Sequence, residues 1–205
     1  MPYKIDEGGG VFYAPKIDIK VHDAIGREWQ GATVQIDLNL PERFDVTFVN
    51  DKGERERAVM IHRVLFGSLE RFVGGLIEHY AGNFPLWLNW EQVAVIPVRE
   101  SALDYARNIA TKLRGENFRV HLDEQAGDLR NRVKEAQQRK ANYMLVVGDK
   151  EAAAGTVSVR RRGSRDEERG VTLDAFVDRI KKERESKALP ADFVQHEPSA
   201  GDSVA

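Results

Sequence analysis

The sequence predicts an antiparallel α+β region followed by an α/β domain built on a central mixed sheet. Residues 16–22 and 33–38 alternate apolar and polar side chains, a pattern typical of half-buried antiparallel strands. Beyond residue 89 the pattern changes to alternating strands and helices, which is typical of a compact α/β sandwich. We therefore expect one domain over residues 1–88 and a second over residues 89–187.

Composition limits the classes of function. The chain has 205 residues, a net charge of −2 and no cysteine. Disulfides and thiolate metal sites are therefore excluded, and any RNA contact must use a local basic patch. No apolar run approaches the roughly 20 residues of a membrane span, and the N-terminal MPYKIDEGGG lacks the apolar core of a signal peptide. We expect a cytoplasmic protein that binds no membrane and no DNA.

The first region begins with two strands joined by a turn, and we expect an antiparallel meander after them. We expect the strand over 16–22 to turn at residues 23–26 and to return from Arg27 into the strand over 33–38. A further turn is expected at residues 50–53, where Asn, Asp, Lys and Gly follow one another.

The segment from Ala58 to Gly82 predicts a buried strand that leads into a helix. The short apolar run at 59–61 favours the strand. Apolar side chains then recur at three- and four-residue steps, as on one helix face, and Gly82 lies where a helix would end. The members of this stripe are Leu65, Leu69, Phe72, Val73, Leu76, Ile77 and Tyr80.

Arg71 lies near the start of that helix and off its apolar stripe, so it has two interpretations. It is a solvated arginine beside Glu70, as most charged helix residues are. Alternatively it binds phosphate, because helix N-termini and guanidinium groups both suit anions.

Seven elements are expected in the second domain. Ser101 with Asp104 predicts a capped helix, and Thr172 opens the last helix. In order, the elements are a strand at 93–98, a helix from 101, a strand at 118–122, a helix around 129–136, strands at 143–147 and 156–161, and a helix from 172.

The motifs VMIHR at 59–63 and GSLERF at 67–72 resemble motif 3 of class II aminoacyl-tRNA synthetases, and most closely that of the threonyl-tRNA synthetases. The resemblance implies that Arg71 lies against ATP, with Ser68 in the same binding site. It also implies that His62 is one of three protein ligands to an active-site zinc ion.

Two upstream motifs extend the resemblance. FYAPKID at 12–18 is similar to a family motif in which Tyr13 would lie beside the amino acid and Lys16 near the nucleotide. WQGATVQID at 29–37 is similar to another, in which Gln30 and Gln35 would line the adenylate site. The family's Cys-Gly pair is replaced here by Gly31 and Ala32, a departure in the pocket wall.

The chemistry that the resemblance implies is attack of a carboxylate on the α-phosphate of ATP. Both reactants are anionic, so positioning and neutralisation by Arg71, Lys16 and Mg²⁺ would carry the catalysis. Zinc would distinguish threonine from valine by binding its hydroxyl, but only one of the three family ligands is present. Motifs 1 and 2 have no counterpart in this sequence, so we expect no catalysis by this chain alone.

The second domain also carries a resemblance. YMLVVGDKE at 143–151 and GTVSVRRRG at 155–163 are similar to the anticodon-binding domain of the same synthetases. By position, Glu151 and Arg160 match residues that read anticodon bases. The arginine run at 160–162 is either a solvated hairpin end or a basic cluster for single-stranded RNA.

One departure concerns a further anticodon contact. An asparagine of the family is replaced by Ala126, which has no side-chain amide for that contact, whereas the helix that follows keeps a basic face. The residues expected on that face are Arg130, Arg132 and Lys134.

These observations leave three interpretations. The chain is the C-terminal part of a threonine–tRNA ligase, with tRNA(Thr), threonine and ATP as its partners and a homodimer as the family's full-length form. Alternatively it is a stand-alone tRNA-binding module without catalysis, or a non-functional gene remnant. We expect residues 188–205 to form a disordered tail. We also expect the partial catalytic sheet to expose edge strands and apolar surface, so that the isolated chain is poorly behaved as a monomer.

Overall fold

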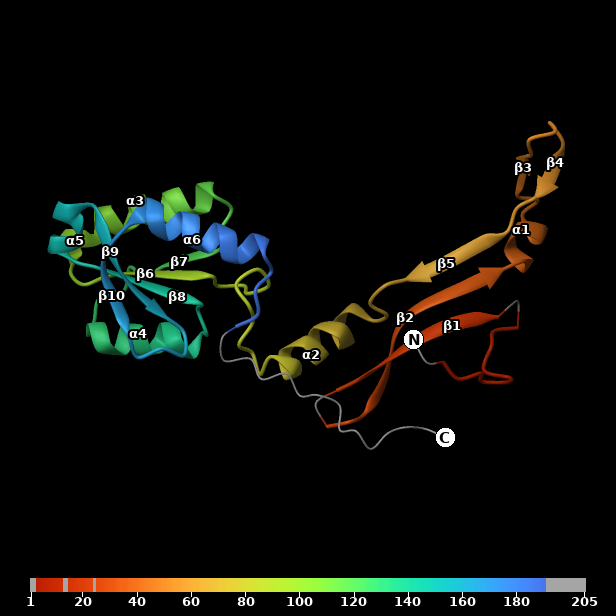
Figure 1. Ribbon diagram of the computed structural model, residues 1–205, viewed down its shortest axis with the longest axis horizontal. Coiled ribbons are helices and arrows are strands. Elements are labelled where there is room, and N and C mark those ends of the chain that lie inside the picture. The colour runs from red at the N-terminus through yellow and green to blue at the C-terminus, as the bar shows by residue number, and fades with distance from the viewer. Residues whose placement is uncertain (1–2, 13–14, 24, 191–205) are drawn as a thin grey trace. The chain divides into compact units, whose positions relative to one another are not determined.

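The computed structural model describes residues 3–12, 15–23 and 25–190. The chain divides into two compact units, Met1–His79 and Tyr80–Ala205, which are considered separately (Figure 1). Tyr13 and most of the expected tail, from residue 191 onward, lie outside the described residues. The domain boundary near Asn89 stays a prediction, although Leu86 is already packed into the core of the second unit.

An antiparallel sheet organises the first unit and confirms the two predicted strands on either side of the turn at 23–26, whereas β3 and β4 form a hairpin of their own in place of the predicted meander. Its order is β1-β2-β5, and β2 pairs with both neighbours. A short hairpin and two helices complete the unit. The elements are β1 (Lys16–His22), β2 (Glu28–Asp37), α1 (Asn39–Arg43), β3 (Thr47–Val49), β4 (Arg55–Arg57), β5 (Met60–Val64) and α2 (Leu69–His79).

A β-bulge interrupts the pairing of β1 with β2. Asp18 lies opposite Thr33 and Lys20 opposite Gln30, so two steps on β1 match three steps on β2. The extra residue falls at Gly31 and Ala32, and it inverts the alternation of β2 on either side of this point.

The apolar face of this sheet is exposed, so the prediction of half-buried strands is wrong for the described part of the chain. Ile17 of β1 is 69% exposed. The run at 59–61 is not a buried strand either, since Val59 is 58% and Ile61 is 64% exposed. No residue of α2 is buried. Alternation shows which side chains share a face, but a second layer must cover that face, and the described residues do not supply one.

The second unit contains the predicted mixed sheet, in the order β10-β9-β8-β6-β7. β6 runs parallel to β7 and β8, and β9 is antiparallel to both β8 and β10. Two of its elements, β10 and α5, were not predicted from the sequence. The elements are β6 (Val93–Pro97), the 3-10 helix η1 (Glu100–Ala102), α3 (Leu103–Gly115), β7 (Val120–Leu122), α4 (Leu129–Gln138), β8 (Tyr143–Val147), α5 (Asp149–Ala154), β9 (Thr156–Arg161), β10 (Glu167–Thr172) and α6 (Leu173–Glu185).

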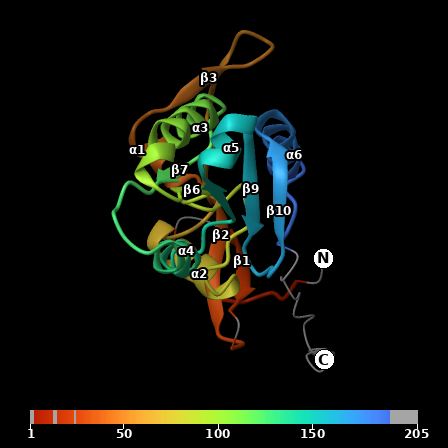
Figure 2. The same cartoon turned by 90° about the vertical axis from the view of Figure 1, so that its left-hand side faces the viewer.

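Helices cover both faces of this sheet (Figures 1 and 2). On one face α3 and α6 bury Ile109 and Phe176 against the strands. On the other face α4 buries Val133 against the opposite side chains of β6 and β8. The short helix α5 lies beside β9 (Figure 2). None of the described helices is long and apolar enough to cross a membrane.

Of the two helix starts predicted from cap residues, one is confirmed. The Thr172 hydroxyl accepts a hydrogen bond from the Ala175 amide at 3.3 Å and caps α6. The cap predicted at Ser101 is wrong, because η1 precedes α3 and the Ser101 hydroxyl instead donates to the Asp149 carboxylate at 2.6 Å.

Candidate functional site

A row of polar side chains crosses the first sheet. Lys16 on β1 lies directly opposite Gln35 on β2, and Gln35 lies opposite His62 on β5. Directly opposed residues project from the same face of an antiparallel sheet. Three of the predicted site residues therefore share one face, although they come from three strands.

The β-bulge adds Gln30 to this face. In a regular strand Gln30 and Gln35 would point to opposite faces, because they are five positions apart. With the extra residue at Gly31 and Ala32, the Gln30 amide donates to the Asp18 carboxylate at 3.0 Å. Lys16 binds the same carboxylate at 2.8 Å and holds its pKa below the usual value for aspartate.

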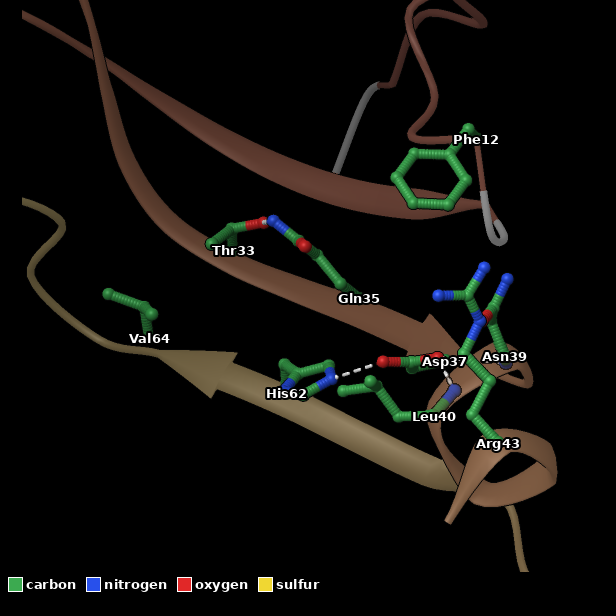
Figure 3. A pocket seen from close by; sticks show the side chains of 9 residues that line it. All are labelled: Phe12, Thr33, Gln35, Asp37, Asn39, Leu40, Arg43, His62 and Val64. Atoms are coloured by element: carbon green, nitrogen blue, oxygen red, sulfur yellow. Dashed lines mark hydrogen bonds and ion pairs between the residues drawn. The ribbon is translucent and has the colours of Figure 1, made fainter.

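A pocket of about 390 Å³ opens on the same face (Figure 3). His62 points into it, and its Nε2 lies 2.8 Å from a carboxylate oxygen of Asp37. The pocket is lined by Phe12, Thr33, Gln35, Asp37, Asn39, Leu40, Arg43, His62 and Val64.

Asp37 is buried and fully engaged by the local fold. Its other oxygen accepts hydrogen bonds from the amides of Asn39 and Leu40, both at 2.9 Å, where the chain enters α1. The Leu40 amide contributes most, and with the bond to His62 it lowers the pKa of Asp37 below the usual value. The carboxylate therefore fixes one ring nitrogen of His62.

Asp37 closes the motif at 29–37, and no role was predicted for it. Its position two residues before Asn39 could have indicated a role, because an aspartate just before a helix commonly accepts hydrogen bonds from the first amides of that helix. Its contact with His62, 25 residues later, depends on the pairing of β2 with β5 and has no signal in either segment alone.

The implied zinc site can be tested against these residues. A structural or catalytic zinc site needs at least three protein ligands. Within the described ranges no group of three or more histidine, cysteine, aspartate or glutamate side chains could hold a metal ion. His62 has Asp37 as its neighbour and no second candidate ligand of this kind, so the described residues do not fit a complete zinc site.

Arg71 and Ser68 lie at the start of α2, outside this row. The Ser68 hydroxyl donates to Glu70 at 2.8 Å and accepts from the Arg71 amide at 3.4 Å. The preceding loop packs on the bulge, because a Cβ atom at Gly67 would lie 3.0 Å from the carbonyl oxygen of Gly31. In the described part of the chain, the Arg71 side chain makes no hydrogen bond or ion pair with the polar row.

A second polar cluster lies where α5 meets β9. The Glu151 carboxylate accepts from the Gly148 amide at 2.9 Å with one oxygen and from the Ser158 hydroxyl at 3.0 Å with the other. Burial opposes ionisation of Glu151, but these hydrogen bonds outweigh it, and the pKa of Glu151 lies below its usual value.

The three consecutive arginines of β9 and its turn have different roles. Arg160 pairs with Glu167 of β10 at 2.9 Å, and Arg161 lies 3.8 Å from Glu183 of α6. Arg162 donates to three backbone carbonyls, those of residues 83, 84 and 140, and so ties the start of the unit to its core. The run is therefore not a uniformly solvated hairpin end.

The expected basic face of α4 needs a correction. Arg130 and Lys134 are exposed, but Arg132 is buried. Its guanidinium group binds the Asp123 carboxylate and the carbonyl oxygens of Asp123 and Pro97, each at 2.9 Å. Arg132 thus anchors the loop that contains Ala126 to the end of β6, and it is not available to a ligand.

Comparison with protein families divides the chain as the fold does. Residues 3–80 match the tRNA synthetase class II core domain (G, H, P, S and T), and residues 92–183 match an anticodon binding domain.

Among curated relatives, the threonine–tRNA ligase of Sulfurihydrogenibium sp. (strain YO3AOP1) is 48% identical over 181 residues, which are 88% of this chain and 28% of that protein. The corresponding ligase of Clostridioides difficile (strain 630) is 48% identical over 187 residues, 91% of this chain and 29% of that protein. The chain thus spans less than a third of the length of these relatives.

Two solved structures have similar folds. One is the RNA binding domain of threonyl-tRNA synthetase from Cryptosporidium parvum Iowa II, with a TM-score of 0.77 and 34% identity over 91% of this chain and 46% of that chain. The other is a putative threonyl-tRNA synthetase from Aeropyrum pernix, with a TM-score of 0.61 and 30% identity over 89% of this chain and 45% of that chain.

Proposed function

This chain belongs to the threonyl-tRNA synthetase family, whose C-terminal region it matches in both units, and from that premise we propose that it serves ATP-dependent attachment of threonine to tRNA(Thr). Its first unit forms one wall of the site for threonine and ATP, and its second unit reads the anticodon. Neither unit completes the reaction alone. The reaction takes place in the cytoplasm, together with translation, and a homodimer carries it out.

The observation that carries the catalytic half is the polar row of Lys16, Gln35 and His62, to which the bulge adds Gln30. Two anionic reactants must approach each other, so cations and hydrogen-bond donors on one rigid surface lower the barrier mainly by positioning. Lys16 provides a cation at the edge of the row, and Arg71 a second one at the start of α2, just after the loop that packs on the bulge.

ATP would bind with Mg²⁺, which neutralises phosphate charge as the α-phosphate is attacked. The residues of this chain would hold the substrates and orient them. The pocket around His62 has room for a small polar molecule, and its Thr33, Gln35 and Asn39 side chains supply hydrogen-bonding groups. The adjoining position of Tyr13 remains a prediction from the motif.

For the anticodon half, Glu151 and Arg160 supply complementary chemistry. A carboxylate accepts from the exocyclic amine of a base, and a guanidinium group donates to a guanine edge or stacks on an exposed base. Both side chains lie in one cluster of the second unit, on α5 and on the adjacent β9.

Filter binding of the chain to tRNA(Thr) and to a transcript with one changed anticodon base tests this half. We expect about fivefold or more tighter binding to the unchanged tRNA, because a base-specific contact contributes about 1–3 kcal/mol. Equal affinity for the two transcripts would refute anticodon recognition. A separate measurement of ATP–pyrophosphate exchange should show no threonine-dependent signal for this chain alone, and such a signal would contradict the proposed division of the site.

A further inference from the structure

Each of the two proposed base-reading side chains is held by another side chain, and Glu167 also lies 3.5 Å from Arg169. Ser158 donates its hydroxyl to Glu151 at 3.0 Å, and Glu167 accepts from Arg160 at 2.9 Å. Ser158 and Arg160 are two residues apart on β9 and so project from the same face. The strand pairing places Glu167 directly opposite Arg160 on that face.

Burial separates the holding residues from the held ones. Ser158 is only 2% exposed, and the Glu167 side chain is 18% exposed. The Arg160 side chain, by contrast, is 39% exposed, and Glu151 is partly exposed. The partners thus lie at the base of the cluster, and the proposed readers reach toward solvent.

Each reader keeps unused hydrogen-bonding capacity. A carboxylate has about four acceptor positions, and the Gly148 amide and Ser158 hydroxyl occupy one on each oxygen of Glu151. A guanidinium group has five N–H donors; the bond to Glu167 uses one of those of Arg160 and the Nε–H is buried, which leaves three on the two Nη atoms. The bonds that fix these side chains therefore leave acceptors and donors for a base.

We propose that Ser158 and Glu167 are positioning residues for anticodon recognition, which set the orientations of Glu151 and Arg160 before RNA binds. This inference rests on the proposed function of the second unit. Glutamate and arginine side chains lose considerable rotamer entropy when they are fixed, so fixing them in the free protein favours the matched base. A side chain free to reorient would accept several bases with similar affinity.

The loss of Glu167 should change RNA affinity in a way that distinguishes positioning from a general charge effect. Its negative charge opposes the approach of phosphate groups, so its loss alone would strengthen binding to every RNA equally. A positioning role predicts something else, namely that Glu167→Gln loses affinity for tRNA(Thr) relative to a transcript with a changed anticodon base. The discrimination ratio is the dissociation constant for the changed transcript divided by that for tRNA(Thr). A loss of positioning lowers this ratio, whereas a general electrostatic effect leaves it unchanged.

The experiment measures that ratio by filter binding at one salt concentration for the wild-type chain and four variants. Ser158→Ala and Glu167→Gln should each reduce the ratio about fivefold or more. Glu168→Gln is the matched control, because it removes the same charge from the next residue of β10, which binds Arg179 of α6 at 2.6 Å. Ser158→Thr keeps the hydroxyl and should retain the wild-type ratio.

The outcomes are distinct. Wild-type ratios in both Ser158→Ala and Glu167→Gln would overturn the inference while leaving the proposed function intact. An equal loss in Glu168→Gln would overturn it too, because the effect would then belong to charge or stability. A wild-type chain that does not discriminate between the transcripts would refute the proposed function itself. Circular dichroism confirms folding of each variant, and Glu167→Gln keeps the test decisive if Ser158→Ala does not fold.

Discussion

Replacing Arg132 by methionine should destabilise the second unit by about 3–5 kcal/mol, the usual cost of leaving one buried charge without its partner. Arg132 and Asp123 have side chains that are 8% and 6% exposed, so water cannot replace the lost guanidinium group. The substitution also leaves the carbonyl oxygens of Asp123 and Pro97 without their donors. Because α4 is tied to β6 through these bonds, the loss should be felt across the sheet.

Two variants test the cause of that loss. In the double variant Asp123→Asn with Arg132→Met no charge stays buried, and the side-chain oxygen that accepts from the Gln125 amide is kept. Only the two orphaned carbonyls remain, at roughly 1 kcal/mol each, so the double variant should be more stable than the single one by about 1 kcal/mol or more. Arg130→Met, on the exposed face of the same helix, should change stability by less than about 0.5 kcal/mol.

Hydrogen exchange of the β6 and β8 amides, combined with urea unfolding, reports the stability of this unit separately from the first. If the double variant proved as unstable as Arg132→Met alone, the uncompensated charge would not be the cause. If Arg130→Met matched Arg132→Met, the effect would belong to the helix sequence and not to the buried pair.

Three further predictions concern both units. Gly67→Ala should lower the free energy of unfolding by about 1–2 kcal/mol or more, because Gly67 has φ +67° and the new Cβ atom would press on a carbonyl of β2. Gly53→Ala is the control: it has φ +80° and open space around it, so it measures the backbone strain alone in the same urea assay. The pKa of Glu151 is lowered on folding, so its hydrogen bonds contribute stability above the unfolded pKa of about 4.3 that is lost as pH falls through the folded value. Glu151→Gln should remove that part of the acid sensitivity in unfolding curves between pH 3 and 6. Leu69 and Phe72 are 60% and 37% exposed, so the chain should self-associate and bind a hydrophobic dye. Changing the two residues to glutamate should reduce self-association and dye binding. A sharp monomer peak for the wild-type chain in size-exclusion chromatography would contradict this prediction.

The sequence predicted the elements well where local pattern decides them. Alternation located β1 and most of β2, and the apolar run at 143–147 located β8 at its observed bounds. It missed β10, whose sequence EERGVT has no clear alternation and contains Gly170 in the bulged pairing with β9. The pairing partner, not the segment's own pattern, makes that strand.

Burial was harder to predict from the sequence than secondary structure. The isoleucines of β1 alternate as core residues do, yet Ile17 is exposed because the layer that would cover it is absent from the described residues. On α4 the sequence indicated three cations on one face, but only the packed helix shows that Arg132 faces inward while Arg130 and Lys134 do not. A helical period gives relative directions, and packing sets which direction is the interior.

For the site, motif resemblance supplied the residues and the sheet supplied their arrangement. Lys16, Gln35 and His62 come from separate motifs, and only the strand register shows that they form one row. The roles of Asp37, Ser158 and Glu167 in holding their neighbours depend on contacts across strands, which no single motif encodes.

The extra residue in β2 also constrains how this protein can change. Deleting either Gly31 or Ala32 would restore even pairing with β1 and turn the Gln30 amide to the far side of the ribbon, although every motif letter beyond the deletion would survive. Length in this short stretch is thus under tighter control than residue identity, so single-residue gaps here should be far rarer among active relatives than substitutions at the same two positions.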